Sequence, residues 1–330
     1  MDDLLSERAI VTKLRRPFIL HGYRLPYQSP LECLRSAFKL NNETCNIWSH
    51  FCPFLLLLIS SWRNFSKHSI FDPIMWPLVS FECLAAFVFL MSSIAHTFCV
   101  MSPKMLGFQI HSHCKHQVSS NVHDLLFLLD FAGISMLMVG AGQGYFFYSS
   151  TSVSPITLYD SPSIFFTVSL VISSFATYLT GISMLTKVSN NSLFAVASFA
   201  IPYIFSTSPF VYKLYKKENE SIGDKALTSM FHRQFFYFFV GALVHAIKIP
   251  ERFAPGKFDF IGNSHNLMHI FTALGIFQTN SLFVEELSMR DYQPIPGIAI
   301  WNTFGVLLIC ILSNFTVAGL LFLRRYSKIK

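Results

Sequence analysis

Long apolar segments alternate with short polar ones along almost the whole chain. Eight segments each approach the roughly 20 apolar residues that an α-helix needs to cross the hydrocarbon core of a membrane. They cover residues 46–62, 76–98, 125–148, 163–185, 192–212, 231–249, 264–284 and 296–323. Because every backbone polar group must be satisfied within lipid, helices are the expected form. The pattern predicts an all-α membrane protein, a bundle of seven core transmembrane helices with an eighth C-terminal helix.

These segments divide the chain into three parts. We expect a cytoplasmic N-terminal segment at residues 1–45, a transmembrane helical domain at residues 46–323, and a short basic tail at residues 324–330. The domain has no internal repeat, so the spans are expected to form one unit.

A short helix is predicted within the N-terminal segment. Ser29 and Glu32 are spaced as a capping box around Pro30, a residue that suits the first helical turn. Leu34 and Phe38 would then fall on one apolar face, which indicates a helix lying along the inner membrane surface. A polar linker is the alternative interpretation of this stretch.

Composition supports the membrane assignment. The chain is 52% hydrophobic and only 13% charged, and it contains 36 phenylalanines. A soluble domain carries about a quarter charged residues, which supply its polar surface. A single water-soluble core could not hide this excess of apolar surface, so lipid is its expected solvent.

The net charge of +7 is expected to face membrane lipids rather than nucleic acid. Outside the apolar segments, the sequence has no basic stripe interleaved with aromatic residues. Lys and Arg are more frequent on the N-terminal side of the spans, which predicts a cell-membrane protein with a cytoplasmic N-terminus. The basic loop after the fifth segment, around residues 213–225, argues against this orientation.

Two histidines at the start of the seventh segment are candidate metal ligands. His265 and His269 are four residues apart, so both imidazoles lie on one helix face, in a common arrangement for zinc. Alone, the pair is a weak signal, because such spacing more often reflects two ordinary polar residues at a helix entry. His96 ends the second segment, and Asp130 lies inside the third, where a buried carboxylate is costly and points to function.

Span parity brings these residues to one level. An even-numbered span ends, and an odd-numbered span begins, on the side of the membrane where the N-terminus lies. His96, Asp130, His265 and His269 therefore share one membrane border. Three histidines with an open fourth position predict a zinc ion (Zn2+). Asp130 could orient a bound water or accept a proton.

Two further features are open to more than one interpretation. Glu82, in the middle of the second segment, could bind the polar part of a lipophilic ligand or pair with a neighbouring helix. The loop at residues 101–124 could hold a second metal through His111, His113, Cys114 and His116, but nothing fixes its geometry, and we favour a mobile loop.

Three ordered motifs resemble the progestin and adipoQ receptor family over nearly the whole chain. They are Gly22–Arg24 with Asn42–His50, then Ser92–Thr97, then Pro250–Arg252 with Pro255–Gly256, Phe258–Asp259 and Ser264–His269. The stretch from His96 to Lys104 and the eighth segment are more similar to the membrane progestin receptor branch. Compared with the family, residues from about 107 to 123 look inserted.

The resemblance implies zinc on three histidines near the cytoplasmic face, with Asp and Ser close by. These correspond to His96, His265, His269, Asp130 and Ser92. Two functions remain open. One is a lipid-binding receptor for a progestin-like steroid with rapid non-genomic signalling, for which a G protein is a candidate partner. The other is a zinc-dependent, ceramidase-like amidohydrolase of an N-acyl sphingolipid, in which Asp130 transfers a proton and Ser92 positions the reacting groups.

Overall fold

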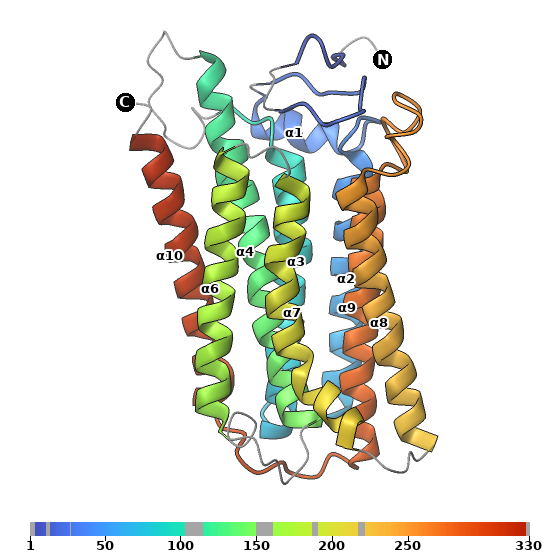
Figure 1. Cartoon of the computed structure of the whole chain (residues 1–330), viewed down its shortest axis with the longest axis vertical. Helices are drawn as coiled ribbons and strands as arrows, with labels where there is room; N and C mark the ends of the chain where they lie inside the picture. The colour runs from blue at the N-terminus through green and yellow to red at the C-terminus, as the bar shows by residue number, and fades with distance from the viewer. Residues whose placement is uncertain are drawn as a thin grey trace.

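The computed structural model describes residues 4–10, 14–26, 28–102, 115–149, 161–186, 191–216 and 222–327. Eight long helices lie alongside one another, and each overlaps one predicted apolar segment (Figure 1). They are α2 (Thr44–Lys67), α3 (Trp76–Phe98), α4 (Lys115–Ser149), α6 (Pro162–Thr186), α7 (Asn191–Lys216), α8 (Ile222–Ile247), α9 (Ser264–Met289) and α10 (Val306–Ser327). The predicted all-α membrane class is confirmed.

Six of these helices are long and apolar enough to cross a membrane: α2, α3, α4, α6, α9 and α10. The spans of α3 and α10 include the short turns η2 (Pro73–Met75) and η4 (Trp301–Gly305). Neither α7 nor α8 is among the six, although both run beside the others in Figure 1. His232, Arg233 and Gln234 lower the mean hydropathy of α8. The count of seven helices plus one therefore stays a prediction.

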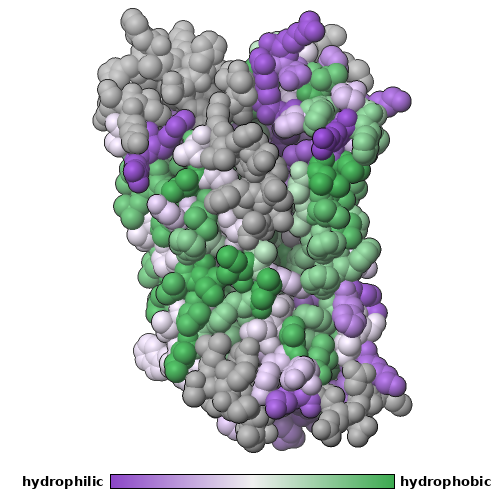
Figure 2. Space-filling view, in the orientation of Figure 1, coloured by the Kyte–Doolittle hydropathy of each residue, from purple (hydrophilic) through white to green (hydrophobic). Residues whose placement is uncertain are grey.

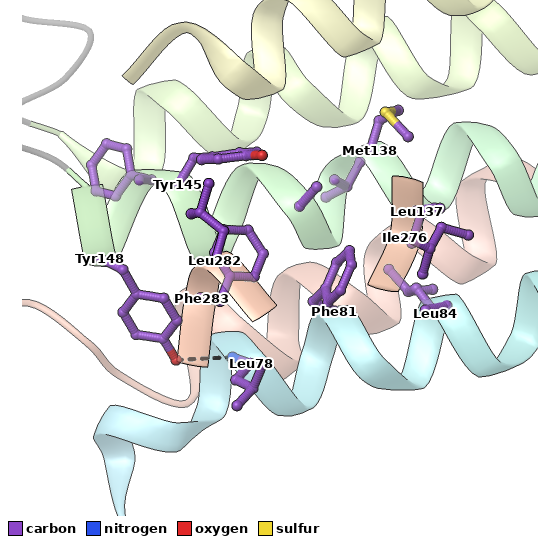
Figure 3. Close-up of a cluster of buried hydrophobic side chains, with 14 of the residues drawn as sticks. Leu78, Phe81, Leu84, Leu137, Met138, Tyr145, Tyr148, Ile276, Leu282 and Phe283 are labelled. Atoms are coloured by element: carbon purple, nitrogen blue, oxygen red, sulfur yellow. Dashed lines mark hydrogen bonds between the residues drawn. The ribbon is translucent and has the colours of Figure 1, made fainter. Parts of the chain in front are cut away.

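The helices pack around α4, which contacts α3, α6, α7, α9 and α10. Side chains from α3, α4 and α9 form a buried aromatic core (Figure 3). In it, the ring of Phe283 meets the rings of Phe81 and Tyr145 edge to face, with centroids 5.2 and 4.9 Å away. A Cβ at Gly144 would collide with the Phe283 ring, so this glycine allows α9 to approach α4.

A short helix, α1 (Pro30–Ser36), lies at the end of the bundle where the N-terminal segment gathers (Figure 1). Ser29 and Glu32 form the predicted capping box. Leu34 and Phe38 are 47% and 77% exposed, as an apolar face turned toward lipid requires. The placement of α1 on the membrane surface is still a prediction.

Long-range contacts fix the N-terminal segment to the bundle. The Asp259 carboxylate accepts hydrogen bonds from the backbone N–H groups of Leu20 and His21, at 3.0 and 2.8 Å. Gly22 has φ of 87°, and a Cβ there would press on Phe260. Only glycine adopts this backbone conformation readily, so the turn that Asp259 holds in place depends on Gly22 of the first motif.

Polar and apolar surfaces are separated along the bundle axis. Figure 2 shows a hydrophobic belt across the middle of the molecule and hydrophilic side chains at both ends. This pattern fits a bundle embedded in lipid. Of the His-rich loop, residues 103–114 lie outside the described residues, as does the side chain of His116. The segment at 107–123 that looked inserted is helical from Lys115 onward.

Candidate metal centre

Three histidine side chains from two helices meet at the end of the bundle that carries the N-terminal segment. His96 lies in the last turn of α3, and His265 and His269 lie in the first two turns of α9. The Nε2 atom of His265 is 3.3 Å from Nε2 of His96 and 3.2 Å from Nε2 of His269. One ring nitrogen from each residue lies within 4.8 Å of the others. The chain thus presents a compact group of three nitrogen donors.

These separations match the geometry of a zinc site. With Zn–N bonds of about 2.0–2.1 Å, two nitrogens on a tetrahedral ion lie roughly 3.3–3.4 Å apart. Nitrogen lone pairs this close repel one another unless a proton or a cation lies between them. The donor set therefore fits a tetrahedral divalent ion with one position left over. Binding of zinc itself stays a prediction.

The first turn of α9 is fixed by its own capping groups. Asn263 is the N-cap, and its side chain accepts hydrogen bonds from the N–H groups of His265 and Asn266. Ser264 donates both its backbone N–H and its hydroxyl to the carboxylate of Glu251. Because the helix starts rigidly at this residue, the four-residue spacing holds both histidines toward α3.

Glu43, the residue before α2, orients His96. Its Oε2 is 2.7 Å from Nδ1 of His96. A carboxylate only accepts hydrogen bonds, so Nδ1 carries the proton and the lone pair of His96 is on Nε2, facing the other histidines. Asn46 also donates to Glu43, at 2.7 Å, and its Oδ1 accepts from Asn266 in α9. The carboxylate thus connects α2, α3 and α9.

The charge of Glu43 is stabilised although the group is buried. Burial raises its pKa, but the Arg16 guanidinium, 2.8 Å from Oε1, and then His96 outweigh this effect. The pKa of Glu43 is consequently held well below its ordinary value. Sequence reasoning assigned Glu43 no role. Its position at the start of an odd-numbered span, on the histidine side, was the available signal.

His269 has contacts of its own on α2. Its Nδ1 lies 3.3 Å from the hydroxyl of Ser49, and its ring stacks on that of His50, with centroids 4.0 Å apart. If Nε2 of His269 faces a metal, Nδ1 carries the proton and donates it to Ser49. Each of these contacts restricts rotation of the ring.

Asp130 and Ser92 form a separate buried pair. Both side chains are buried, and they interact with each other. Ser92 precedes His96 by four residues, so this pair lies about one helical turn further into the bundle. Among the described residues, the metal-competent group contains the three histidines and not Asp130. A catalytic role for either residue stays a prediction.

Glu82 lies between helices, in the second turn of α3, nearer the end of the bundle away from the histidines. Asn280 of α9 and Asn64 of α2 donate hydrogen bonds to its Oε1, at 3.0 and 3.2 Å. Of the two interpretations left open by the sequence, the structure supplies the contacts for pairing with neighbouring helices. Ligand binding by Glu82 stays a prediction.

Comparison with known proteins assigns the family. A family model described as Haemolysin-III related matches residues 38–109 and 104–279. The chain is 30% identical over 313 residues to membrane progestin receptor delta of Homo sapiens, covering 91% of this chain and 84% of the relative. It is 25% identical over 306 residues to membrane progestin receptor gamma of Homo sapiens, with 90% and 86% covered. Because the matches span most of the chain and all three histidines, the protein belongs to the haemolysin-III-related family, the progestin and adipoQ receptor family that its motifs resemble.

Proposed function

We propose that this protein is a cell-membrane receptor for a progestin-like steroid, with a zinc ion held by His96, His265 and His269. Its relatives are named membrane progestin receptors, which supports a steroid as the ligand class. These names carry the proposal, and a small hollow in the bundle, lined by aromatic and aliphatic side chains with a few polar groups, is where we place the ligand. Steroid sites have this composition, because rigid apolar rings carry oxygen only at their ends.

The hollow lies between α4, α7, α8 and α9, beside the aromatic core, and is about 10 Å³ in volume. Gln234 is its polar centre: Tyr145 donates a hydrogen bond to its Oε1 at 2.8 Å, and Thr279 donates to the same oxygen. Its amide nitrogen has only a long contact, of 3.4 Å, with the hydroxyl of Tyr203. A steroid ketone could accept a better hydrogen bond from this nitrogen.

A hollow this small has room for about one water molecule, so a steroid could enter only if the surrounding helices part. The interface that would open joins α7 to α8, because α8 packs extensively on α9 and only slightly on α7. A ligand that binds the open arrangement shifts the population toward it. We infer that a cytoplasmic partner, for which a G protein is a candidate, binds the open arrangement preferentially at the histidine end of the bundle.

The metal centre has a structural part in this proposal. The three histidines would hold the ion, which supplies a crosslink between α3 and α9. Glu43 and Ser49 orient two of the rings, and both belong to the region of α2. Three helices would therefore stay together at this end while α7 and α8 separate further along the bundle.

Binding of a labelled progestin to the purified full chain in lipid nanodiscs tests the proposal. We expect saturable binding that an unlabelled progestin displaces. Gln234→Leu should weaken it about tenfold, the effect of removing one well-placed hydrogen-bonding group. Gln278→Leu is the matched control, because that side chain accepts an exposed hydrogen bond from Arg233 and lies outside the hollow.

Two outcomes would refute a steroid site in this hollow. One is an absence of saturable, displaceable binding to the wild-type chain. The other is equal weakening by Gln234→Leu and Gln278→Leu. Thermal melting of both variants without ligand shows whether lost binding reflects lost folding.

A further inference from the structure

A second cavity lies beside the metal centre, between the N-terminal segment and helices α4 and α6. Its volume is about 190 Å³. One side is cationic and the other is apolar; the residues that define these sides are Arg15, Arg16 and Arg24, and Phe127, Phe131 and Met184. None of the three clustered histidines lines it, but Glu43 does, so the cavity borders the metal centre without containing its three nitrogen donors.

The cationic side has more positive charge than the cavity itself neutralises. Three arginines line it, against the single carboxylate of Glu43, which pairs with Arg16. Arg24 donates to the backbone carbonyls of Thr97 and His96 at the end of α3, which leaves Arg15 as the arginine most available to a ligand. The Arg15 side chain donates to backbone carbonyls of Ile10 and Arg8, at 3.2 and 3.5 Å, which fixes its position without cancelling its charge. Asp124 adds one negative charge nearby, 3.6 Å from His123 on the cavity wall. An anion is the complementary ligand.

Two hydrogen-bond donors beside the cavity lack a protein partner among the described residues. The side-chain nitrogen of Asn42 and the Nε of Arg24 are buried, and neither has a hydrogen-bond partner in the described part of the chain. Both residues are only 3% exposed, and both line the cavity. Neither nitrogen is itself accessible to water, so each lies behind the cavity surface and its side chain must turn before it can donate to a ligand.

The apolar side indicates what is attached to the anion. Phe127 and Phe131 lie in the early turns of the membrane-spanning part of α4, and Met184 lies two residues before the end of α6. The cavity is therefore at the border of the hydrocarbon, where lipid headgroups lie. We propose that it binds the phosphate headgroup of an anionic lipid, with the beginning of the acyl chains against Phe131 and Met184.

Arginine suits this role because its planar donors match a phosphate in two-point hydrogen bonds. Arg16 also connects the lipid site to the metal centre, since it pairs with the carboxylate that orients His96. The proposal rests on the cavity alone and stands whether or not the protein binds a steroid.

Native mass spectrometry of the purified full chain, titrated with phosphatidic acid or phosphatidylcholine, provides the test. We expect a one-to-one adduct with phosphatidic acid that forms at least about tenfold more tightly than with phosphatidylcholine. Arg15→Gln should weaken this adduct about tenfold. Arg8→Gln makes the same charge change at an exposed residue outside the cavity, and should change affinity less than about twofold.

Inorganic phosphate distinguishes a lipid from a soluble ligand. No displacement of phosphatidic acid by millimolar phosphate supports the lipid site. Displacement at equal concentrations would overturn it in favour of free phosphate. Equal weakening by Arg15→Gln and Arg8→Gln would overturn it too, because the attraction would then come from the general surface charge. Arg15 is exposed, so its variant should melt like the wild-type chain.

Discussion

Two buried polar clusters lie near opposite ends of α9. They differ in whether the side chains of the cluster balance one another in charge and hydrogen bonding. At the far end, Lys213 of α7 forms an ion pair with Glu286 of α9, at 2.7 Å, and the Ser149 hydroxyl donates to the same carboxylate oxygen at 3.1 Å. Charge and hydrogen bonds balance there. At the near end, one ring nitrogen from each of three histidines lies within 4.8 Å of the others, and all three are metal-ligating atoms.

This difference distinguishes an ion pair that only holds helices together from a cluster that binds a ligand. The pair of Lys213 and Glu286 needs nothing else to hold α7 against α9. The histidine cluster becomes favourable only when a cation fills the space between its lone pairs. A buried polar cluster whose members all offer the same kind of atom therefore identifies a bound species, whereas a balanced cluster identifies a helix contact.

The largest expected effect is loss of the metal from His265→Ala. An intact zinc site contributes on the order of 10 kcal/mol of binding free energy, so removal of the nitrogen shared by both short contacts should abolish stable binding. Elemental analysis of the purified protein should give about one zinc per chain, and close to none in the variant. Chelator should lower the melting temperature of the wild-type chain only.

The matched control is His232→Ala, an exposed histidine on α8. It should keep its metal and its response to chelator. If His265→Ala retained zinc at the wild-type level, the histidine cluster would not be the metal site and would only hold helices together, as the pair of Lys213 and Glu286 does.

The next effect concerns the far cluster. Lys213→Met leaves the carboxylate of Glu286 buried without its charge partner, which should destabilise the fold by about 3–5 kcal/mol. Adding Glu286→Leu removes the stranded charge and should restore most of that loss. Unfolding by denaturant in micelles measures both variants. A double variant as unstable as the single one would show that this pair is more than a balanced contact.

The smallest effect is expected at the carboxylate that orients His96. Glu43→Gln should weaken metal binding about 10- to 100-fold, because a neutral amide orients the imidazole less well than a carboxylate. Competition with a chelator of known affinity measures the change. Glu32→Gln, at the exposed capping box of α1, should leave metal affinity unchanged. Equal affinities for both variants would remove Glu43 from the metal centre.

The sequence predicted the helices well because lipid imposes a simple rule on them. Each apolar segment became a helix, but α4 begins at Lys115 rather than near residue 125, and α8 at Ile222 rather than near 231. These early turns are polar, and hydropathy does not detect a helix that continues beyond the apolar part. Hydropathy also left α7 and α8 outside the set of clear spans.

The sequence predicted at which membrane border the candidate site lies, but not all of the residues that form it. Span parity placed His96, His265 and His269 at one border, and the structure brings these three together. Span parity alone could not single out Glu43, because it places every residue just before an odd-numbered span at this border. The contact with His96 joins positions 53 residues apart and depends on how α2 packs against α3.

The hydrogen bond between Asp259 and Leu20 joins residues 239 positions apart. During synthesis, His96 and the segment over it emerge early, but the carboxylate that fastens this segment, together with His265 and His269, is translated only near the end. A nascent chain stalled after α8 would therefore lack the Asp259 contacts, and its amino-terminal segment would be held only by contacts with the first helices, such as the pair of Arg16 and Glu43. This end of the molecule can therefore finish folding only after the last third of the chain has been synthesised.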